Sequence, residues 1–501
     1  MRDGSVRRFY PYWFATVGRG GTLERDHGYR QKIYRAWDAH LGSQQSVSPR
    51  DVLPEDDLVF FLLDVIPQLD LSALHQHYAG ELRGQPPYDV TMMVTLLIYA
   101  YAVGIPSSRK IAAACERNLA FRAIVGAAPP DFRTLSDFRK IHGVAFKSLF
   151  IEVLRLAGAM GLVKLGNLST DGTKMKANAS RHKAMSYGSM TKDIARREAE
   201  IEQLLKQAEQ TDTEQDAALG SRRGDELPAE LKRREDRLAK IRVAKARLEA
   251  EARVRADGEQ RRRDDEQAKR EAEGRQRRGQ EPAAIDPTPA DKAQTNFTDA
   301  QAKIMKQSNK GFDYSYNAQA VVDGQEQIIV AAAVTAAAND KQSRRAGMPM
   351  GQAALDNLDA AGIARPQAAD GTPVPIPNTA DNGYFSDEAV EELTGMGFDP
   401  HIATGRQKHN QAPLPLAAGA PVAEASVPEK MAHKLRSAAG KLLYAARKHI
   451  VEPVFGQIKS ARGIRKFLLR GLDKVSAEWQ LICLTHNLLK IWRRAARAAT
   501  C

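Results

Sequence analysis

The spacing of apolar residues predicts helices along the first third of the chain. After Pro54 the apolar positions recur every three or four residues, as on one face of a helix: Leu58, Phe61, Leu62, Val65 and Ile66. The same spacing predicts three further helices, over residues 90–102, 107–118 and 135–159. Residues 1–50 have no such period and are assigned to no element. The pattern therefore predicts an all-helical N-terminal domain over residues 51–165.

Strand-like segments follow this helical part. In "VKLGNLSTDGTKMKANAS" a short apolar run ends at Asp171-Gly172, where we expect a turn. The run "YSYNAQAVVDGQEQIIVAAAVT" holds two strands, joined at Asp323-Gly324 by a predicted tight hairpin turn. Both segments are rich in residues that favour a pleated sheet.

Helices and strands then alternate toward the C-terminus. The pattern predicts a helix over residues 341–361, a strand that ends at Asp381, a helix capped by Ser386 and a strand over residues 400–405. A closing helix has an apolar side made of Val475, Trp479, Ile482, Leu488 and Trp492. This order predicts an α/β domain with a mixed sheet and flanking helices, made of residues 166–186 and 297–501.

A highly charged segment, residues 187–296, interrupts the predicted sheet domain. Its apolar positions predict two helices, one with Ile194, Ile201, Leu204, Leu205 and Ala208, and one with Leu231, Leu238, Ile241, Leu248 and Ala252. We expect "GDELPAE" to form the turn between them and residues 260–294 to be disordered. Mixed charge of this density is typical of a solvated face, so we assign this inserted helical hairpin no chemistry.

The charge balance favours a polyanionic partner. The 501 residues include 74 Lys and Arg against 61 Asp and Glu, a net charge of +13, which points to nucleic acid before other partners. A basic but otherwise ordinary soluble enzyme has the same balance. The three cysteines form no CxxC pair, which suits a reducing cytosol. The longest apolar run, Met92–Ile105, is shorter than the roughly 20 residues of a membrane span, so we expect a buried helix and no membrane.

Two basic helices in the N-terminal domain leave two interpretations open. They lie in "SSRKIAAACERN" and "RTLSDFRKIHGVAFKSLF", on either side of a breaker. Two short basic helices with a turn between them are typical of a DNA-reading unit, and equally of a packed helical bundle.

Three acidic residues stand at the ends of predicted elements. Asp171 and Asp381 each follow a strand-like run, and Glu452 precedes Pro453, where we expect a helix to begin. Such positions converge at the edge of an open sheet. Carboxylates brought together repel one another unless a cation joins them, and oxygen ligands select Mg²⁺ or Mn²⁺. An Asp-Gly after a strand is more often only a turn, and Asp323 and Asp340 have similar surroundings.

Cationic residues surround the three acids. Lys174 and Lys176 follow Asp171 in the same strand-like segment, and the predicted helix places Lys459 two turns after Glu452. Two divalent ions about 4 Å apart can activate a hydroxyl and stabilise the leaving oxygen in phosphodiester displacement. Acids beside cations therefore suit a site that holds both metal and phosphate.

Several motifs occur together in one order: "STDGTKMKANAS", "YNAQAVVD", "ADNGYFS", "IATGRQKH" and "IVEPVFGQIK". The chain thereby resembles bacterial insertion-sequence transposases of the DDE class over roughly residues 53–492. The resemblance implies an RNase H-like catalytic core with Asp171, Asp381 and Glu452 as catalytic residues and ligands of two Mg²⁺ ions, for which Mn²⁺ can substitute.

The resemblance also implies residues that hold DNA. Related transposases have a Tyr-x2-Arg-x3-Glu-x6-Lys signature, which Tyr444, Arg447, Glu452 and Lys459 resemble, although four residues separate Arg447 from Glu452 here. Lys174, Lys176, Arg447 and Lys459 are the implied DNA-binding residues. We expect double-stranded DNA as partner, both terminal inverted repeats and target DNA, and a homodimer on that DNA. The implied location is cytoplasmic and nucleoid-associated.

The predicted function is that of a DNA transposase, which cleaves strands at element ends and transfers them to target DNA. No ATP is implied, because each transesterification conserves bond energy. The chain has no HExxH, GxxxxGK[ST] or GxSxG motif, and we expect His486 to be a packed residue and not a ligand. Two alternatives stay open: an RNase H-like nuclease that only hydrolyses DNA, and a non-catalytic DNA-binding descendant.

Overall fold

The computed structural model describes residues 48–80, 85–219, 227–274, 283–307, 309–337, 344–405, 415–417, 419–422 and 424–500. They form two compact units. One combines the described residues of Met1–Ala177 with those of Ile304–Cys501, and the other lies within Asn178–Lys303. The predicted N-terminal extension, residues 1–50, falls almost wholly outside the described residues.

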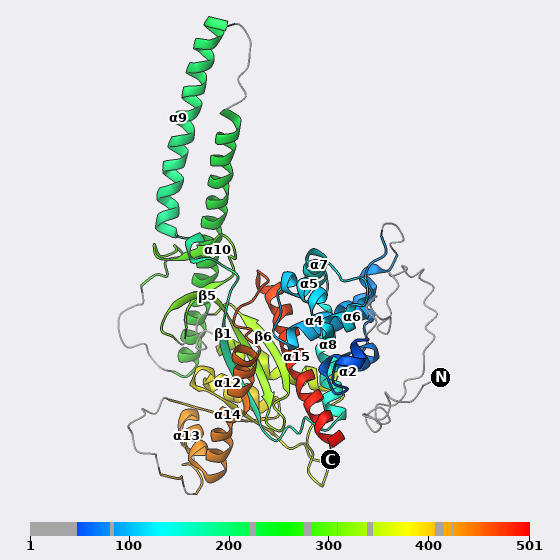
Figure 1. The fold of residues 1–501 in the computed structure, drawn as a ribbon. Coiled ribbons are helices and arrows are strands. Elements are labelled where there is room, and N and C mark those ends of the chain that lie inside the picture. The colour runs from blue at the N-terminus through cyan, green and yellow to red at the C-terminus, as the bar shows by residue number, and fades with distance from the viewer. Residues whose placement is uncertain are drawn as a thin grey trace. The chain divides into compact units, whose positions relative to one another are not determined.

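A six-stranded mixed sheet lies at the centre of the first unit (Figure 1). Its order is β4-β5-β1-β7-β8, and β6 also pairs with β5. The strands are β1 (Leu168–Lys176), β4 (Lys303–Lys306), β5 (Phe312–Asp323), β6 (Ile329–Thr335), β7 (Ile376–Ala380) and β8 (Phe398–Ile402). β1 is antiparallel to β5 and parallel to β7, which is parallel to β8. This confirms the predicted mixed α/β fold and is consistent with an RNase H-like core.

Five helices accompany the strands: α11 (Arg344–Ala360), α12 (Asp387–Gly395), α13 (Val427–Arg436), α14 (Ala438–Gly456) and α15 (Leu472–Thr500). The predicted cap is confirmed, since the Ser386 hydroxyl accepts the Ala389 N–H at the start of α12. α15 packs against β6, and its predicted apolar residues Val475, Trp479, Ile482 and Leu488 are buried. The sheet is therefore closed on one side by the last helix of the chain.

The helical N-terminal part belongs to the same unit. Its helices are α1 (Pro49–Val52), α2 (Leu58–Val65), α3 (Ser72–His75), α4 (Val90–Ala102), α5 (Ser108–Arg117), α6 (Leu119–Val125), α7 (Phe132–Ile141) and α8 (Ala145–Ala159), with short 3₁₀ turns at Ile66–Gln68 and Gln76–Tyr78. α4 is buried along nearly its whole length, which confirms the expected buried helix. The predicted single helix over residues 135–159 is wrong, because the chain breaks around Gly143, where an added Cβ would lie 3.1 Å from the Ala477 side chain of α15.

A buried polar network joins these helices to α15. The Glu478 carboxylate accepts the Tyr101 hydroxyl at 3.0 Å, and Arg139 donates to the same hydroxyl at 2.8 Å. All three side chains are almost completely buried. In the part of the chain that the structure describes, no single helix is long and apolar enough to cross a membrane; Leu58–Gln68 and Ser72–Tyr78 reach that length only together, as a pair bent by 78°.

Three strand predictions need correction. The predicted turn at Asp171-Gly172 is wrong, because β1 continues through both residues while β5 pairs with it from Leu168 to Lys176. The turn after Asp323 is not tight: β6 begins only at Ile329, and Gln327 takes a left-handed conformation with φ of 60°. The strand predicted over residues 400–405 lies earlier, in β8.

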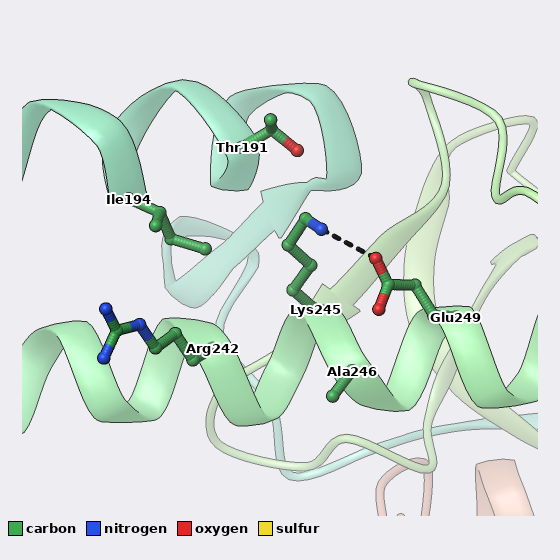
Figure 2. Close-up of a pocket in the computed structure, with 6 residues that line it drawn as sticks. All are labelled: Thr191, Ile194, Arg242, Lys245, Ala246 and Glu249. Atoms are coloured by element: carbon green, nitrogen blue, oxygen red, sulfur yellow. Dashed lines mark hydrogen bonds and ion pairs between the residues drawn. The ribbon is translucent and has the colours of Figure 1, made fainter.

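The second unit contains α9 (Tyr187–Leu219), α10 (Leu227–Ala272) and a two-stranded sheet of β2 (Ala184–Ser186) and β3 (Gln294–Asn296). The two helices pack through a small core of Met190, Ile241 and Leu248. The predicted disorder is wrong for residues 260–272, which continue α10. A pocket between the helices is lined by Thr191, Ile194, Arg242, Lys245, Ala246 and Glu249 (Figure 2), none of which is a predicted site residue.

Candidate active site

The register of two parallel strands places two of the predicted acids side by side. β1 and β7 pair from Leu168↔Asn378 to Thr170↔Ala380, and the next residues in the two strands are Asp171 and Asp381. Both side chains are partly buried. Because parallel strands present their carboxyl ends at the same edge of a sheet, the two aspartates stand where the strands begin to separate.

Asp381 is held by the turn that follows β7. Its carboxylate accepts the Gly383 N–H at 2.8 Å and caps a 3₁₀ turn over Asn382–Tyr384. Tyr384, from the "GYF" sequence, is 2% exposed, and its hydroxyl donates to the Gln319 side chain of β5. Since β1 lies between β7 and β5, this contact ties the Asp381 turn to the strand on the far side of Asp171.

The edge of β1 next to β7 is open beyond Asp171. Lys176 is the next residue to form backbone hydrogen bonds at this edge, with Arg465 and Phe467. Between these points side chains satisfy the backbone: the Asp171 carboxylate accepts the Gly172 N–H at 2.7 Å, and the Lys459 ammonium donates to the Lys174 carbonyl at 2.7 Å. The strand therefore splits from its neighbour beside the predicted acids, as in the crevices where open sheets bind ligands.

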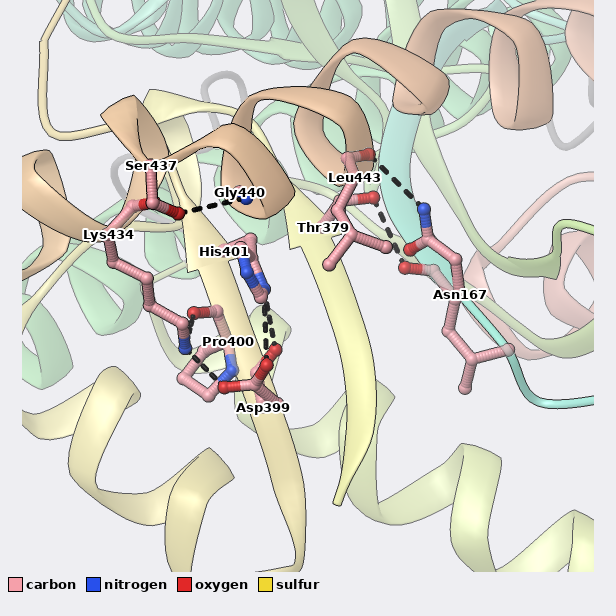
Figure 3. A network of polar contacts seen from close by, with 10 residues as sticks. Asn167, Thr379, Asp399, Pro400, His401, Lys434, Ser437, Gly440 and Leu443 are labelled. Carbon is pink, nitrogen blue, oxygen red and sulfur yellow. Dashed lines mark hydrogen bonds and ion pairs between the residues drawn. The ribbon is translucent and has the colours of Figure 1, made fainter. Parts of the chain in front are cut away.

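Helix α14, which carries the third acid, is anchored to the ends of β1 and β8. Figure 3 shows Lys434, in the preceding helix α13, bonded to the Asp399 carboxylate and, at 2.8 Å, to the Pro400 carbonyl of β8. The Asn167 amide at the start of β1 donates to the Leu443 carbonyl of α14 at 3.2 Å. These bonds hold α13 and α14 beside the amino-terminal parts of β1 and β8, while the pair of Arg447 with Asp171 links α14 to the aspartates.

The predicted helix start at Glu452 is wrong. α14 begins at Ala438 and runs through Glu452, with Pro453 inside the helix. Proline has no N–H to offer the carbonyl four residues earlier, so that carbonyl needs another donor. The His449 carbonyl accepts the Gln327 side-chain amide at 2.9 Å, which replaces the missing bond. A π-helical turn, Gln457–Ala461, then carries Lys459.

Arg447 faces all three predicted acids. Its guanidinium donates to the Asp171 carboxylate at 3.0 Å and lies 5.9 Å from the centre of the Tyr444 ring. Burial lowers the pKa of Arg447, but the charges of Asp171, Tyr444, Asp381 and Glu452 act in the other direction and raise it above its ordinary value. The α14 helix thus brings Glu452, whose side chain is exposed, to the neighbourhood of both aspartates.

Lys459 is held at the same edge. Its ammonium donates to the Thr173 hydroxyl as well as to the Lys174 carbonyl. Burial, and secondarily the charge of Arg465, lowers the pKa of Lys459 to about 8. Lys459 therefore braces β1 against the turn that follows α14.

Lys174 and Lys176 are not brought to the acids. Side chains alternate along a strand, so both lie on the face of β1 opposite to Asp171 and Thr173. Lys176 pairs with Asp313 of β5 at 2.9 Å. Their role as DNA contacts stays a prediction.

Two other candidates in the sequence have structural roles. Asp323 is completely buried and accepts the backbone N–H groups of Lys164, Leu165 and Gln325. The expectation for His486 is confirmed: it is 1% exposed, and its Nε2 lies 3.0 Å from the Gln327 carbonyl. Asp340 lies outside the described residues.

The predicted ligands suit divalent ions by their chemistry. Asp171 and Asp381 offer only oxygen atoms, which Mg²⁺ and Mn²⁺ prefer, and both directly follow the paired part of two neighbouring strands. Among the described residues no three His, Cys, Asp or Glu side chains are gathered as a ready metal site. Arg447 occupies one oxygen of Asp171 instead. The aspartate pair therefore fits such an ion, with Glu452 nearby on α14 as the third carboxylate.

Three features of the site were not indicated by sequence patterns alone. These are Gln319, its contact with Tyr384, and Thr173. Gln319 and Asn317 are buried polar residues two positions apart in strand β5. An added Cβ on Gly172 would lie 2.3 Å from the Gln319 amide nitrogen and 2.7 Å from the Asn317 oxygen. The alternation of two amides in "YNAQAVV" is the signal that could have found this layer beneath Asp171.

Comparison with protein families gives two matches. The family described as "Transposase domain (DUF772)" matches residues 47–141, which cover helices α1 to α7. The family described as "Transposase DDE domain" matches residues 421–492, which include Arg447, Glu452 and Lys459 but neither aspartate. Comparisons with curated proteins and with solved structures give no match. Two separate parts of the chain, residues 47–141 and 421–492, are therefore similar to a DUF772 transposase domain and to a DDE transposase domain, which together point to transposition.

Proposed function

We propose that this protein is a transposase, which cleaves DNA strands at the ends of its element and joins them to target DNA at one site, made of Asp171, Asp381 and Glu452. The observation that carries the proposal is the position of two aspartates directly after the paired part of β1 and β7, with α14 facing them through Arg447. The DDE match over α14 supports it.

The three carboxylates would hold two Mg²⁺ ions, with Mn²⁺ as a substitute. Bound divalent ions make a water or a 3′-hydroxyl a better nucleophile and stabilise the leaving oxygen of a phosphodiester. The chain positions its own ligands. Gly383 and Gly172 orient the two aspartates through their N–H groups, the bond at Asn167 holds α14, and the bond at Lys434 holds the preceding helix α13.

The basic residues would hold the DNA. Arg447 and Lys459 stand at the split edge of β1, beside the acids, and would bind phosphates next to the cleaved bond. Lys174 and Lys176, on the other face of β1, would contact phosphates farther away. The net charge of +13 supports binding to double-stranded DNA.

The remaining parts of the proposal concern assembly. The helical N-terminal domain would recognise the terminal inverted repeats, and joining two ends requires a homodimer on DNA. The protein would act in the cytoplasm, on the nucleoid.

A strand-transfer assay tests the proposal. Labelled element ends, Mg²⁺ and a target plasmid are incubated with the full chain or with its Asp381→Ala variant. The expected result is cleavage and joining by the unchanged chain and neither by the variant. Cleavage without joining would favour a nuclease, and binding without cleavage would favour a non-catalytic DNA-binding protein. Strand transfer by Asp381→Ala would contradict the site.

A further inference from the structure

Arg447 covers one of the two oxygen atoms that Asp171 would offer to a metal ion. The guanidinium donates to Oδ2 of Asp171 at 3.0 Å, while Oδ1 already accepts the Gly172 N–H. Both side chains of the pair are largely buried, with 11% of Arg447 and 19% of Asp171 exposed. A cation of the chain itself therefore covers an Asp171 oxygen that a metal ion could use.

Not all of the other N–H groups of the Arg447 guanidinium form hydrogen bonds. Among the described residues its Nε atom is buried and has no hydrogen-bond partner. An unpaired buried N–H is costly, so the guanidinium is not held here by a complete set of bonds. Its ion pair with Asp171 holds it, and the nearby charges of Asp171, Tyr444, Asp381 and Glu452 raise its pKa. The position of Arg447 is thus set by the carboxylates that the proposed function assigns to metal.

We propose that Arg447 is a resident counter-ion that competes with divalent metal for Asp171. This inference rests on the proposed function of the three acids. Without metal, the guanidinium offsets the repulsion among the carboxylates. When metal binds, the guanidinium must leave Oδ2, and its planar set of donors becomes available to a phosphate. Metal binding is therefore weakened by Arg447, while the fold without metal is stabilised by it.

The two opposite effects distinguish this role from simple packing. A residue that only supports the site would, when removed, weaken both metal binding and the fold. Removal of a competing counter-ion strengthens metal binding while it destabilises the metal-free protein. Arg447→Gln keeps a polar side chain of similar reach without the charge, and Arg447→Lys keeps the charge without the planar guanidinium.

Titration of the full chain with Mn²⁺, with free Mn²⁺ followed by electron paramagnetic resonance, measures this competition without DNA or turnover. Arg447→Gln should bind Mn²⁺ roughly three- to tenfold more tightly, as expected for removal of an ion pair that competes with the ligand. Arg447→Lys should fall between this variant and the unchanged chain. The matched control is Lys441→Gln, which removes an exposed charge from the same helix and should change the affinity less than about twofold.

Thermal denaturation without metal supplies the second readout. Arg447→Gln should unfold at a lower temperature than the unchanged chain, and added Mn²⁺ should raise its midpoint by more. Mn²⁺ binding by Arg447→Gln that is unchanged or weaker would overturn the counter-ion proposal. The Asp171→Asn variant separates the two failures. If it loses Mn²⁺ binding, the proposed site stands without the counter-ion; if it binds as well as the unchanged chain, both proposals fail.

Discussion

Two ion pairs in this protein have similar chemistry, but one joins neighbours on a helix and the other joins residues far apart in the sequence. In α10, Lys245 and Glu249 are one helical turn apart and lie 2.7 Å from each other. In the sheet unit, Arg447 and Asp171 are 276 residues apart in the chain and lie at 3.0 Å. The first pair follows from helical periodicity alone, whereas the second exists only because α14 folds against the ends of β1 and β7. Local pairs can be read from a sequence, but the site depends on the fold.

The two ion pairs should differ most in how strongly a substitution in each one lowers the rate of DNA cleavage. Asp171→Asn should reduce single-turnover cleavage of an element end by about a thousandfold or more, because a proposed metal ligand is lost. The matched change in the local pair, Glu249→Gln, should leave the cleavage rate within about twofold. A large loss in Glu249→Gln would show that the long helices take part in the chemistry.

The next largest effect should come from a substitution that disturbs the buried amides of Gln319 and Asn317, which lie beside Gly172. In Gly172→Ala the added Cβ would lie 2.3 Å from the Gln319 amide, so that Gln319 and Asn317 must move. Overpacking of this kind costs about 1–3 kcal/mol of unfolding free energy, measured by urea denaturation. A matched change at Gly258 of α10, where nothing lies within 4 Å of an added Cβ, should stabilise the protein or leave it unchanged. Equal effects at the two glycines would contradict the tight layer.

The contact between Tyr384 and Gln319 can be removed with less disturbance. Tyr384→Phe deletes a buried hydroxyl and leaves the Gln319 oxygen without that donor, which should cost about 1–3 kcal/mol of unfolding free energy. Because the contact ties the Asp381 turn to β5, the cleavage rate should fall as well. A variant with lowered stability but an unchanged cleavage rate would show that the contact supports only the fold.

Two lysines, Lys459 beside the candidate site and Lys245 of the local pair, should contribute to the pH dependence of stability with opposite signs. Burial lowers the pKa of Lys459 to about 8, whereas the hydrogen bond that Lys245 donates to the Glu249 carboxylate raises the pKa of Lys245. Between about pH 8 and the ordinary lysine value of 10.5, the unfolded chain keeps a proton at Lys459 that the folded chain releases. This contribution to stability therefore rises with pH in that window. Denaturation of the unchanged chain and of Lys459→Met across this range isolates it; a contribution that falls with pH would contradict the buried position.

The smallest effect should come from breaking the local pair. Lys245→Gln should change the unfolding free energy by roughly 0.5 kcal/mol or less, as is usual for neighbouring charges on a helix surface. Urea denaturation measures this difference. A loss above about 1.5 kcal/mol would mean that the pair is part of a larger network.

Much of the fold could be predicted from spacing. The bounds of α4, the Ser386 cap and the buried side of α15 follow from periodicity and capping chemistry, which are local. The errors arise where tertiary contacts override local signals. Asp171-Gly172 resembles a turn, but a long partner strand keeps it extended. Pro453 resembles a helix start, but Gln327 supplies the donor that lets the helix continue.

Only the residues of the candidate site that belong to sequence motifs were predicted. Motifs indicated Asp171, Asp381, Glu452 and Arg447, but not that Arg447 pairs with Asp171, because the geometry of α14 on the sheet is not encoded in spacing. The same holds for Lys174 and Lys176: alternation within β1 places them away from Asp171, which becomes clear only once the strand is known to continue. Residues beneath the site, such as Gln319, belong to no motif.

The central claim is that acids from separate elements act as one catalytic unit, and a comparison of single and double variants tests it most directly. Single-turnover cleavage is measured for Asp171→Asn, Asp381→Asn and the variant with both changes. When two residues act as one catalytic unit, the first substitution already removes nearly all of the rate enhancement that the two residues give together. The account predicts that the double variant is about as slow as either single variant. Losses that multiply in the double variant, or cleavage at the full rate by either single variant, would contradict it.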